Sequence, residues 1–197
     1  IEGIIINIGG GEISITSSDD GFNASDGSGS NIMVPGEFGN SSSSCELNIN
    51  NGNIYVNAGG DGLDSNGIIN INGGTTVVDG PVSDGDGALD SGSEIIINGG
   101  ILIAAGSSGM AETPSDSSGQ NTIAIAFSQS NRALTAVCVK DSDGNIIVSY
   151  QPSKEYSSII ISSPKLISGS EYTIYCGGSI IGADNDYSID GEYEGGE

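Results

Sequence analysis

The sequence predicts an all-β protein, a right-handed parallel β-helix of about four coils followed by a C-terminal antiparallel β cap. Three observations lead to this fold class. Short segments alternate apolar and small polar residues, which is the pattern of strands with one buried face. The connections between these segments are too short for helical crossovers. The same unit also recurs at intervals close to one coil of a solenoid, and parallel strands that lack crossover helices must coil.

The repeat is clearest in residues 45–65, CELNINNGNIYVNAGGDGLDS, which form one complete unit. A strand, a glycine turn, a second strand and a Gly-Asp-Gly corner follow one another. Aligned copies place Ile8, Ile49, Ile71 and Ile97 at one inward position, at intervals of 41, 22 and 26 residues by subtraction of those numbers. Further inward positions and the turn glycines align in the same way: Ile6, Leu47, Ile69 and Ile95; Ile13, Ile54, Thr76 and Leu102; Ile15, Val56, Val78 and Ala104; Gly11, Gly52, Gly74 and Gly100.

We expect the coils within residues 1–111. The first coil covers residues 1–24, and residues 25–44, which are rich in Ser and Gly, form a loop pushed out of the stack. The second, third and fourth coils follow at residues 45–66, 67–92 and 93–111. Cys45 falls at an inward position, which predicts a buried thiol.

The pattern changes after residues 112–120, which we expect to form a linker. Residues 121–182 contain hairpin-like turns such as Asp143-Gly144-Asn145, which predicts a small antiparallel β cap. Such a cap covers the last coil and blocks edge-on aggregation. Cys138 and Cys176 fall on separate strands of the cap, and the sequence leaves open whether they pair or remain two buried thiols. Residues 183–197 form an acidic tail. The expected cap strands are residues 122–127, 134–140, 145–151, 158–162 and 171–176.

Charge narrows the classes of partner. The chain has 26 acidic and 4 basic residues, a net charge of −22, which excludes nucleic acid because little is present to neutralise phosphates. The first 131 residues contain no basic residue at all. Carboxylate-dense coils of this kind repel themselves, so bound cations are expected. These residues show no transmembrane run and no signal peptide, so membrane insertion is not expected.

The acidic corners are the candidate metal-ligating positions. Asp20 and Asp61 align in adjacent coils, with Asp86 near the same place one coil later, and Asp64 and Asp90 form a second row. Hard oxygen ligands from stacked turns suit Ca²⁺, which takes six to eight oxygens in flexible geometry. The alternative is that these side chains simply cap turns by bonding their own backbone.

Five segments carry a resemblance to a known family: DDGFNAS at 19–25, GDGLDSNG at 60–67, GDGALDS at 85–91, NGGILIAAGSSGMA at 98–111, and residues 152–178. They resemble the clostridial-type extracellular carbohydrate-binding β-helix family. The resemblance covers nearly the whole chain, although family members have several further coils before this point. It implies a pectate-lyase-like fold, bound calcium, and binding of acidic plant polysaccharide such as polygalacturonate at the cell surface without cleavage. The implied calcium ligands fall among Asp19, Asp20, Asn23, Asp61, Asp64, Asp86 and Asp90.

The first functional hypothesis is therefore an extracellular, Ca²⁺-dependent carbohydrate-binding module. An acidic protein attracts an acidic polymer through a divalent intermediary, which bridges protein carboxylates to uronate carboxylates. Tyr55 and Phe22 are the candidate sugar-stacking side chains in the coils. Tyr55 alternates with inward residues and is expected to face outward, where it is equally well explained as an isolated surface aromatic.

Two alternatives remain. The first coil is uncapped and presents a free strand edge, so head-to-tail stacking of copies would give a calcium-stabilised structural filament, a homopolymer. A pectin-degrading hydrolase would instead use two carboxylates, for example those of Asp61 and Asp86, as acid and base. We expect no enzyme, because the coils lack a basic residue and carboxylates that bind calcium are poor general acids.

Overall fold

The computed structural model describes residues 1–27, 44–182 and 192–196, and within them the chain forms strands and turns but no α-helix. The all-β class predicted from the sequence is therefore confirmed. Within the same residues, no helix has the length and apolar character needed to cross a membrane. The predicted loop at 25–44 and the predicted acidic tail at 183–197 lie mostly outside the described residues.

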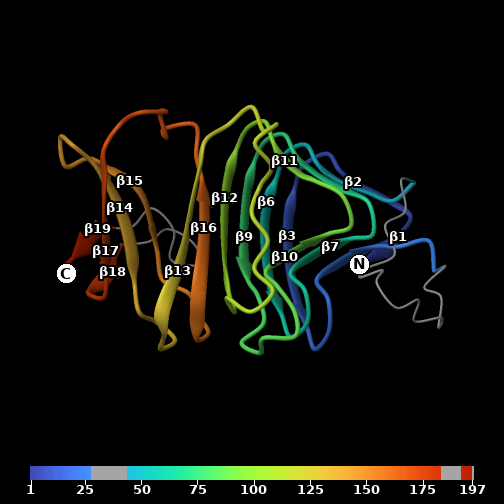
Figure 1. Ribbon diagram of the computed structural model, residues 1–197, viewed down its shortest axis with the longest axis horizontal. Helices are drawn as coiled ribbons and strands as arrows, with labels where there is room; N and C mark the ends of the chain where they lie inside the picture. Colours follow the sequence, from blue (N-terminus) through green and yellow to red (C-terminus); the bar gives the residue numbers. More distant parts are fainter. Residues whose placement is uncertain (28–43, 183–191, 197) are drawn as a thin grey trace.

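The first twelve strands are distributed in rotation over three sheets (Figure 1). The chain enters the first, second and third sheet in turn, and all pairings among these strands are parallel. The first sheet contains β1 (Glu2–Gly3), β4 (Phe22–Ala24), β7 (Leu63–Ser65) and β10 (Leu89–Ser91). The second contains β2 (Ile5–Ile8), β5 (Glu46–Ile49), β8 (Ile68–Ile71) and β11 (Ile95–Ile97). The third begins with β3 (Glu12–Ser17), β6 (Asn53–Ala58), β9 (Thr75–Asp79) and β12 (Ile101–Gly106). We call one passage through the three sheets a round.

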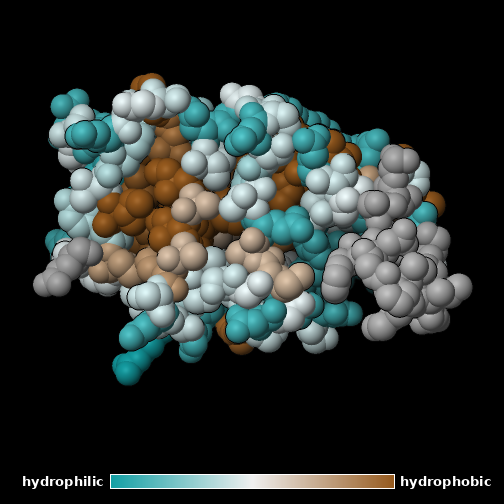
Figure 2. Space-filling model, in the orientation of Figure 1, coloured by the Kyte–Doolittle hydropathy of each residue, from teal (hydrophilic) through white to brown (hydrophobic). Residues whose placement is uncertain are grey.

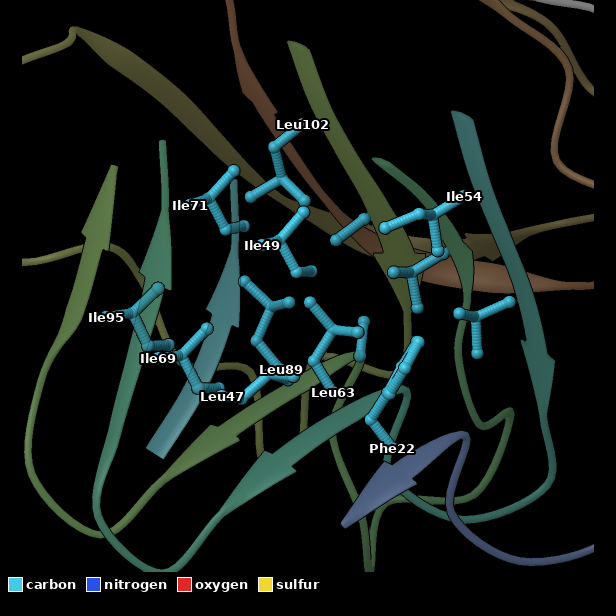
Figure 3. Close-up of a cluster of buried hydrophobic side chains, with 14 of the residues drawn as sticks. Phe22, Leu47, Ile49, Ile54, Leu63, Ile69, Ile71, Leu89, Ile95 and Leu102 are labelled. Carbon is cyan, nitrogen blue, oxygen red and sulfur yellow. The ribbon is translucent and has the colours of Figure 1, made fainter. Parts of the chain in front are cut away.

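The register of these strands follows the alignment of the sequence repeat. Ile8 pairs with Ile49, Ile49 with Ile71, and Ile71 with Ile97. The other aligned inward rows are confirmed in the same way. Figure 3 shows labelled members of these rows, among them Leu47, Ile49 and Ile69, pointing toward one another between the sheets. Complete burial of one such Leu or Ile side chain stabilises the fold by about 1.5–3 kcal/mol relative to its exposure.

The turn between the second and third sheets requires glycine. Gly52, Gly74 and Gly100 have φ angles of 117°, 78° and 81°, in the region that side chains disfavour. A Cβ atom on Gly74 would lie 2.3 Å from the carbonyl oxygen of Gly52, and one on Gly100 would lie 2.5 Å from that of Gly74. The stacked turns therefore leave no room for a side chain, which explains why glycine recurs at this position.

The short strands of the first sheet occupy segments that the sequence predicts as corners. β4, β7 and β10 have three residues each, which is too short for apolar alternation to be recognised. Their pairing places Phe22 beside Leu63 and Leu63 beside Leu89, and all three side chains are fully buried. Each round therefore contains three strands rather than the two predicted strands and a corner.

Beyond the last round the chain becomes antiparallel. The third sheet is mixed, because β16 (Tyr156–Ser162) pairs antiparallel with β12, and β13 (Thr122–Asn131) pairs antiparallel with β16. A fourth sheet contains β15 (Ile146–Tyr150), β14 (Val137–Asp141) and β17 (Tyr172–Cys176), and β18 (Ser179–Ile181) pairs with β19 (Glu192–Glu194). The turn at 143–145 joins β14 to β15 in the antiparallel hairpin that the sequence predicts.

The fourth sheet packs on the outer face of the third through a second apolar cluster, which includes Val77, Ile103, Ile161, Val139 and Val148. A buried carboxylate reinforces this packing. Asp79 accepts hydrogen bonds from the hydroxyl of Tyr55 at 2.9 Å, the hydroxyl of Tyr150 at 2.6 Å and the backbone nitrogen of Ser153 at 3.0 Å. The C-terminal strands are thus fixed to the rounds by apolar burial and by a carboxylate whose oxygens have donors.

The three cysteines are free thiols. Cys45 is fully buried, as its inward position predicts. Cys138 pairs with Tyr175 across the fourth sheet, whereas Cys176 pairs with Val137. Because neighbouring residues of a strand point to opposite faces, the thiols of Cys138 and Cys176 lie on opposite faces of the sheet. This arrangement excludes a disulfide between them.

Candidate functional site

The first sheet carries a row of acidic and amide side chains on its outer face. The register pairs Glu2 with Asn23, Asn23 with Asp64, and Asp64 with Asp90. The flanking residues of β4 and β7 are buried in the core, so the side chains of the row point away from it. Paired strands lie about 4.8 Å apart, which brings the oxygen atoms of successive side chains close together.

A second row precedes these strands and links one round to the next. Oδ1 of Asp20 accepts a hydrogen bond from the backbone nitrogen of Asp61 at 2.9 Å, and Oδ1 of Asp61 accepts one from that of Gly87 at 2.6 Å. The Nδ2 atom of Asn23 donates to Oδ2 of Asp20 at 3.0 Å and so connects the two rows. These carboxylates do accept hydrogen bonds from the backbone of a turn, but that turn belongs to the following round rather than to their own.

Burial and mutual repulsion raise the pKa of several carboxyl groups in these rows. Desolvation raises the pKa of Asp64 to about 7, with further contributions from the negative charges of Asp90, Asp20 and Asp61. The pKa of Asp61 rises to about 6, again mainly through burial. Burial and the charge of Asp90 raise the pKa of Glu112 to about 6. The rows therefore favour the binding of protons or of cations.

The structure brings most of the sequence-predicted ligands together and adds others. The members that interact through hydrogen bonds, register or charge are Asp20, Asn23, Asp61, Asp64, Asp86 and Asp90. Asp19 is exposed, and its backbone carbonyl rather than its side chain takes part in the stacking. Glu112 was not predicted, although its Oε2 atom accepts a hydrogen bond from the backbone nitrogen of Ser91 at 2.9 Å. Because it lies in the expected linker, outside the Gly-Asp repeat, it gave no signal in the sequence. We call these six residues and Glu112 the acidic cluster.

Asn23 provides the structural test of whether a cation fits. Its Oδ1 atom is buried and has no hydrogen-bond partner among the described residues. A buried carbonyl-type oxygen without a donor is a suitable ligand for Ca²⁺, and the neighbouring carboxylates supply the charge. A pocket of about 190 Å³ lies beside it, lined by Glu2, Asn23, Ser25 and Gly27. The chemistry of these donors fits the calcium ion that the family resemblance implies.

The acidic cluster is not a complete metal cage built from charged side chains. Within the described part of the chain, no three Asp, Glu, His or Cys side chains converge closely enough to ligate one ion by themselves. Calcium accepts amide oxygens, backbone carbonyls and water alongside carboxylates. The set that fits it here combines the carboxylates with the Asn23 amide oxygen and leaves coordination positions for other ligands.

The two predicted sugar-stacking residues are not open platforms. The prediction for Phe22 is wrong, because its side chain is fully buried and packs in the core beside Leu63 (Figure 3). Tyr55 faces away from that core, as predicted, but the C-terminal part of the chain covers it. Its hydroxyl donates to Asp79 and lies 3.2 Å from Oγ of Ser153, and partial burial raises the pKa of Tyr55. Both aromatic side chains are used in packing.

The second sheet carries a different kind of row, made of asparagine side chains. Nδ2 of Asn48 donates to Oδ1 of Asn7 at 3.0 Å, and Nδ2 of Asn70 donates to Oδ1 of Asn48 at 2.8 Å. A second ladder with distances of 2.9 and 3.0 Å joins Asn50, Asn72 and Asn98. An amide is both donor and acceptor, so stacked copies satisfy one another across the strand spacing.

No protein-family model, curated protein or solved structure matches the chain. The resemblance to the carbohydrate-binding β-helix family therefore rests on the quoted sequence segments.

Proposed function

We propose that the protein is a right-handed parallel β-helix that binds acidic polysaccharide of the polygalacturonate type through Ca²⁺, outside the cell or at its surface, without cleaving it. The observation that carries this proposal is the acidic cluster. Burial raises the pKa of three of its carboxyl groups, those of Asp61, Asp64 and Glu112, and a buried amide oxygen beside them has no donor among the described residues. Such an arrangement gains most from a divalent cation.

The β-helix part of the proposal is supported by the order of the strands. The chain visits three sheets in rotation, all pairings between successive rounds are parallel, and the inward rows remain in register. A chain that repeats one path at a constant offset along an axis describes a helix of strands. The right hand is taken from the family resemblance.

The cation links the protein to its ligand. Asp64, Asp90 and the Oδ1 atom of Asn23 are the groups of the outer row that would hold Ca²⁺, with Asp61 and Asp20 beside them. The ion supplies positive charge and open coordination positions that a uronate carboxylate can enter. The residues themselves orient the ion, since hydrogen bonds from one round to the next fix the carboxylates of Asp20 and Asp61.

The non-catalytic part of the proposal rests on the absence of a Lys, Arg or His side chain beside the cluster in the part of the chain that the structure describes. No basic residue occurs before Arg132 in the sequence. Lys154 does reach the rounds, but its Nζ atom donates to the backbone oxygen of Ala58, at the end of a third-sheet strand. Proton abstraction beside a uronate carboxylate requires a group within hydrogen-bond reach of that proton.

The filament alternative is not adopted, because the C-terminal end of the rounds is covered. β12 is paired with β16. The backbone oxygens of Ile95 and Ile97 in β11 accept hydrogen bonds from Ser115 and Gln120. Head-to-tail stacking through these strands would have to displace chain segments that already satisfy their edges.

The proposal is tested by measuring the binding of polygalacturonate in Ca²⁺ and in metal-free buffer, by calorimetry. We expect the protein to bind polygalacturonate only when Ca²⁺ is present. We expect Asp64→Asn to lose at least about tenfold in affinity, 1.4 kcal/mol, and Asp143→Asn to lose none. The second variant makes the same charge change on the exposed turn between β14 and β15. Equal binding without metal would contradict the mechanism. Release of reducing sugar by the protein, abolished in Asp61→Asn, would overturn the non-catalytic assignment.

A further inference from the structure

The third sheet extends further along the stack than the other two parallel sheets. The first sheet ends at β10 and the second at β11, whereas β16 and β13 continue the third sheet beyond β12 (Figure 1). Its inward rows continue as well, because Ala104 pairs with Ile160 and Ile160 pairs with Ala124. Ala124 thus occupies a core position of the repeat, yet it is exposed, since within the described residues no strand of the first or second sheet lies opposite it.

A groove takes the place of the missing core. One wall is the inner face of β13 and β16, and the other is the segment at residues 108–118. Two adjoining cavities of about 360 and 220 Å³ make up the groove, and both are lined by Thr113 and Ala124. The larger lies within the range of small-molecule binding sites, about 300–1,000 Å³. Figure 2 shows apolar surface gathered in the C-terminal half of the molecule, whereas the surface of the rounds is largely hydrophilic.

The two ends of the groove differ in chemistry. The larger cavity is lined mainly by hydroxyl and amide side chains, and its charged lining residue is Asp116. The hydroxyl oxygen of Thr122 in this lining is buried without a hydrogen-bond partner among the described residues. The smaller cavity is lined mainly by small and apolar side chains, among them Ala111, Ala124 and Ala126. Small side chains allow a flat ring to approach the backbone closely.

We propose that this groove binds a neutral saccharide segment, at a site separate from the acidic cluster and independent of Ca²⁺. A sugar ring has hydroxyl groups that suit the polar cavity and an apolar C–H face that suits the alanine-lined one. A uronate is disfavoured, because no basic residue lines the groove and Asp116 and the net charge of −22 repel it. A purely apolar chain is disfavoured as well, because it would leave the hydroxyl and amide groups of the larger cavity without partners.

The proposal is tested by adding neutral hexasaccharides of glucose, xylose and mannose to the isotope-labelled chain in metal-free buffer and recording amide chemical shifts. We expect at least one of them to shift amides at 122–126 and 158–160, a set that excludes Glu112 of the acidic cluster and its neighbours, and Ca²⁺ to leave those shifts unchanged. Shifts confined to other regions, or no shifts with all three sugars, would overturn the assignment. So would shifts at 108–126 on dilution of the protein alone, which would show that a second copy fills the groove.

Matched variants locate the effect. Ala124→Phe fills both cavities, and because Ala124 is exposed the variant is expected to fold. Ala126→Phe, at an exposed residue that lines the smaller cavity, is the second variant. Ser128→Phe adds the same ring to an exposed position of β13 outside the groove lining. We expect at least about a tenfold loss of hexasaccharide affinity in the alanine variants and no loss in Ser128→Phe. Polygalacturonate binding with Ca²⁺ is expected to survive in Ala124→Phe, so failure of this proposal is distinguishable from failure of the calcium mechanism. Unchanged hexasaccharide affinity in both alanine variants would overturn the site.

Discussion

The outer rows of the first and second sheets use the same spacing for opposite chemistry. In the second sheet, Asn7, Asn48 and Asn70 donate to and accept from one another across successive strands. In the first sheet, the equivalent row pairs Asp64 with Asp90, and an ionised carboxylate can only accept. The amide row satisfies itself, while the carboxylate row accumulates negative charge, which together with burial raises the pKa of Asp64.

This difference separates a structural ladder from a candidate binding row. Stacking identical side chains at strand spacing is stable when each copy carries both a donor and an acceptor. A carboxylate stack is incomplete by itself and gains stability from a proton or a metal ion. The carboxylate row of the first sheet cannot satisfy its own hydrogen-bonding and charge requirements, and it is therefore the better candidate for a binding site.

The largest expected effect is stabilisation by calcium. At free Ca²⁺ near 100 times its dissociation constant, binding to the folded state adds about 2.7 kcal/mol to the free energy of unfolding. For a chain of this size that corresponds to a rise of roughly 5–10 °C in Tm. Thermal unfolding at pH 8 measures it, with Mg²⁺ at equal ionic strength as the control, because Mg²⁺ demands stricter octahedral geometry. An equal rise in Tm with Mg²⁺ would show that the effect is general screening of the repulsion between carboxylates.

Without calcium, we expect stability to fall as pH rises. The pKa values of Asp64, Asp61 and Glu112 in the folded chain, about 7, 6 and 6, lie above their ordinary values near 4. The folded state binds these protons more tightly, so their stabilising contribution is complete below pH 4 and disappears as pH rises to about 7. After allowance for solvent screening of these part-exposed groups, the free energy of unfolding should be about 2 kcal/mol lower at pH 8 than at pH 5. Urea unfolding in metal-free buffer tests this, and stability that rises over this interval would contradict it.

A reciprocal change makes the amide row resemble the carboxylate row. Asn48→Asp removes the donor that bonds Asn7 and Glu46 and places a second negative charge beside Glu46. We expect a loss of about 1–2 kcal/mol in the free energy of unfolding at pH 8. Asn48→Gln keeps an amide at the same place and serves as the control. If Asn48→Asp were as stable as the parent protein, the ladder would carry no energetic significance.

The sequence was sufficient for the register of the second and third sheets. Their strands have four or more residues in most rounds, and they place Ile, Leu or Val at every position of the four aligned inward rows except Thr76 and Ala104. The strands of the first sheet were not predicted, since a segment of three residues is too short to show the apolar alternation that identifies a strand. The same failure explains Phe22. Its neighbourhood of Asp and Gly suggests an exposed corner, whereas the pairing with β7 turns its ring into the core.

The candidate site was predictable only as far as it repeats. Asp20, Asp61, Asp64 and Asp90 recur at matching places in successive copies, and the structure stacks them. Glu112 joins them from outside the repeat. Likewise, Tyr55 is covered by Ser153, which lies 98 residues further along the chain, and no local sequence pattern predicts such a contact.

The smallest expected effect is the most specific test of the comparison. Asp64→Asn converts one carboxylate into an amide that can donate to the buried Oδ1 of its pair, Asn23. In metal-free buffer at pH 8 we expect the variant to be about 1 kcal/mol more stable than the parent, after allowance for solvent screening, since the charge that it removes is repelled by its neighbours. At pH 3 the carboxyl group is protonated both in the folded chain, where its pKa is about 7, and in the unfolded chain, where its pKa is near 4, so the two proteins should unfold alike. Urea unfolding at both pH values measures the difference, and a variant less stable than the parent at pH 8 would show that Asp64 is already satisfied without a cation.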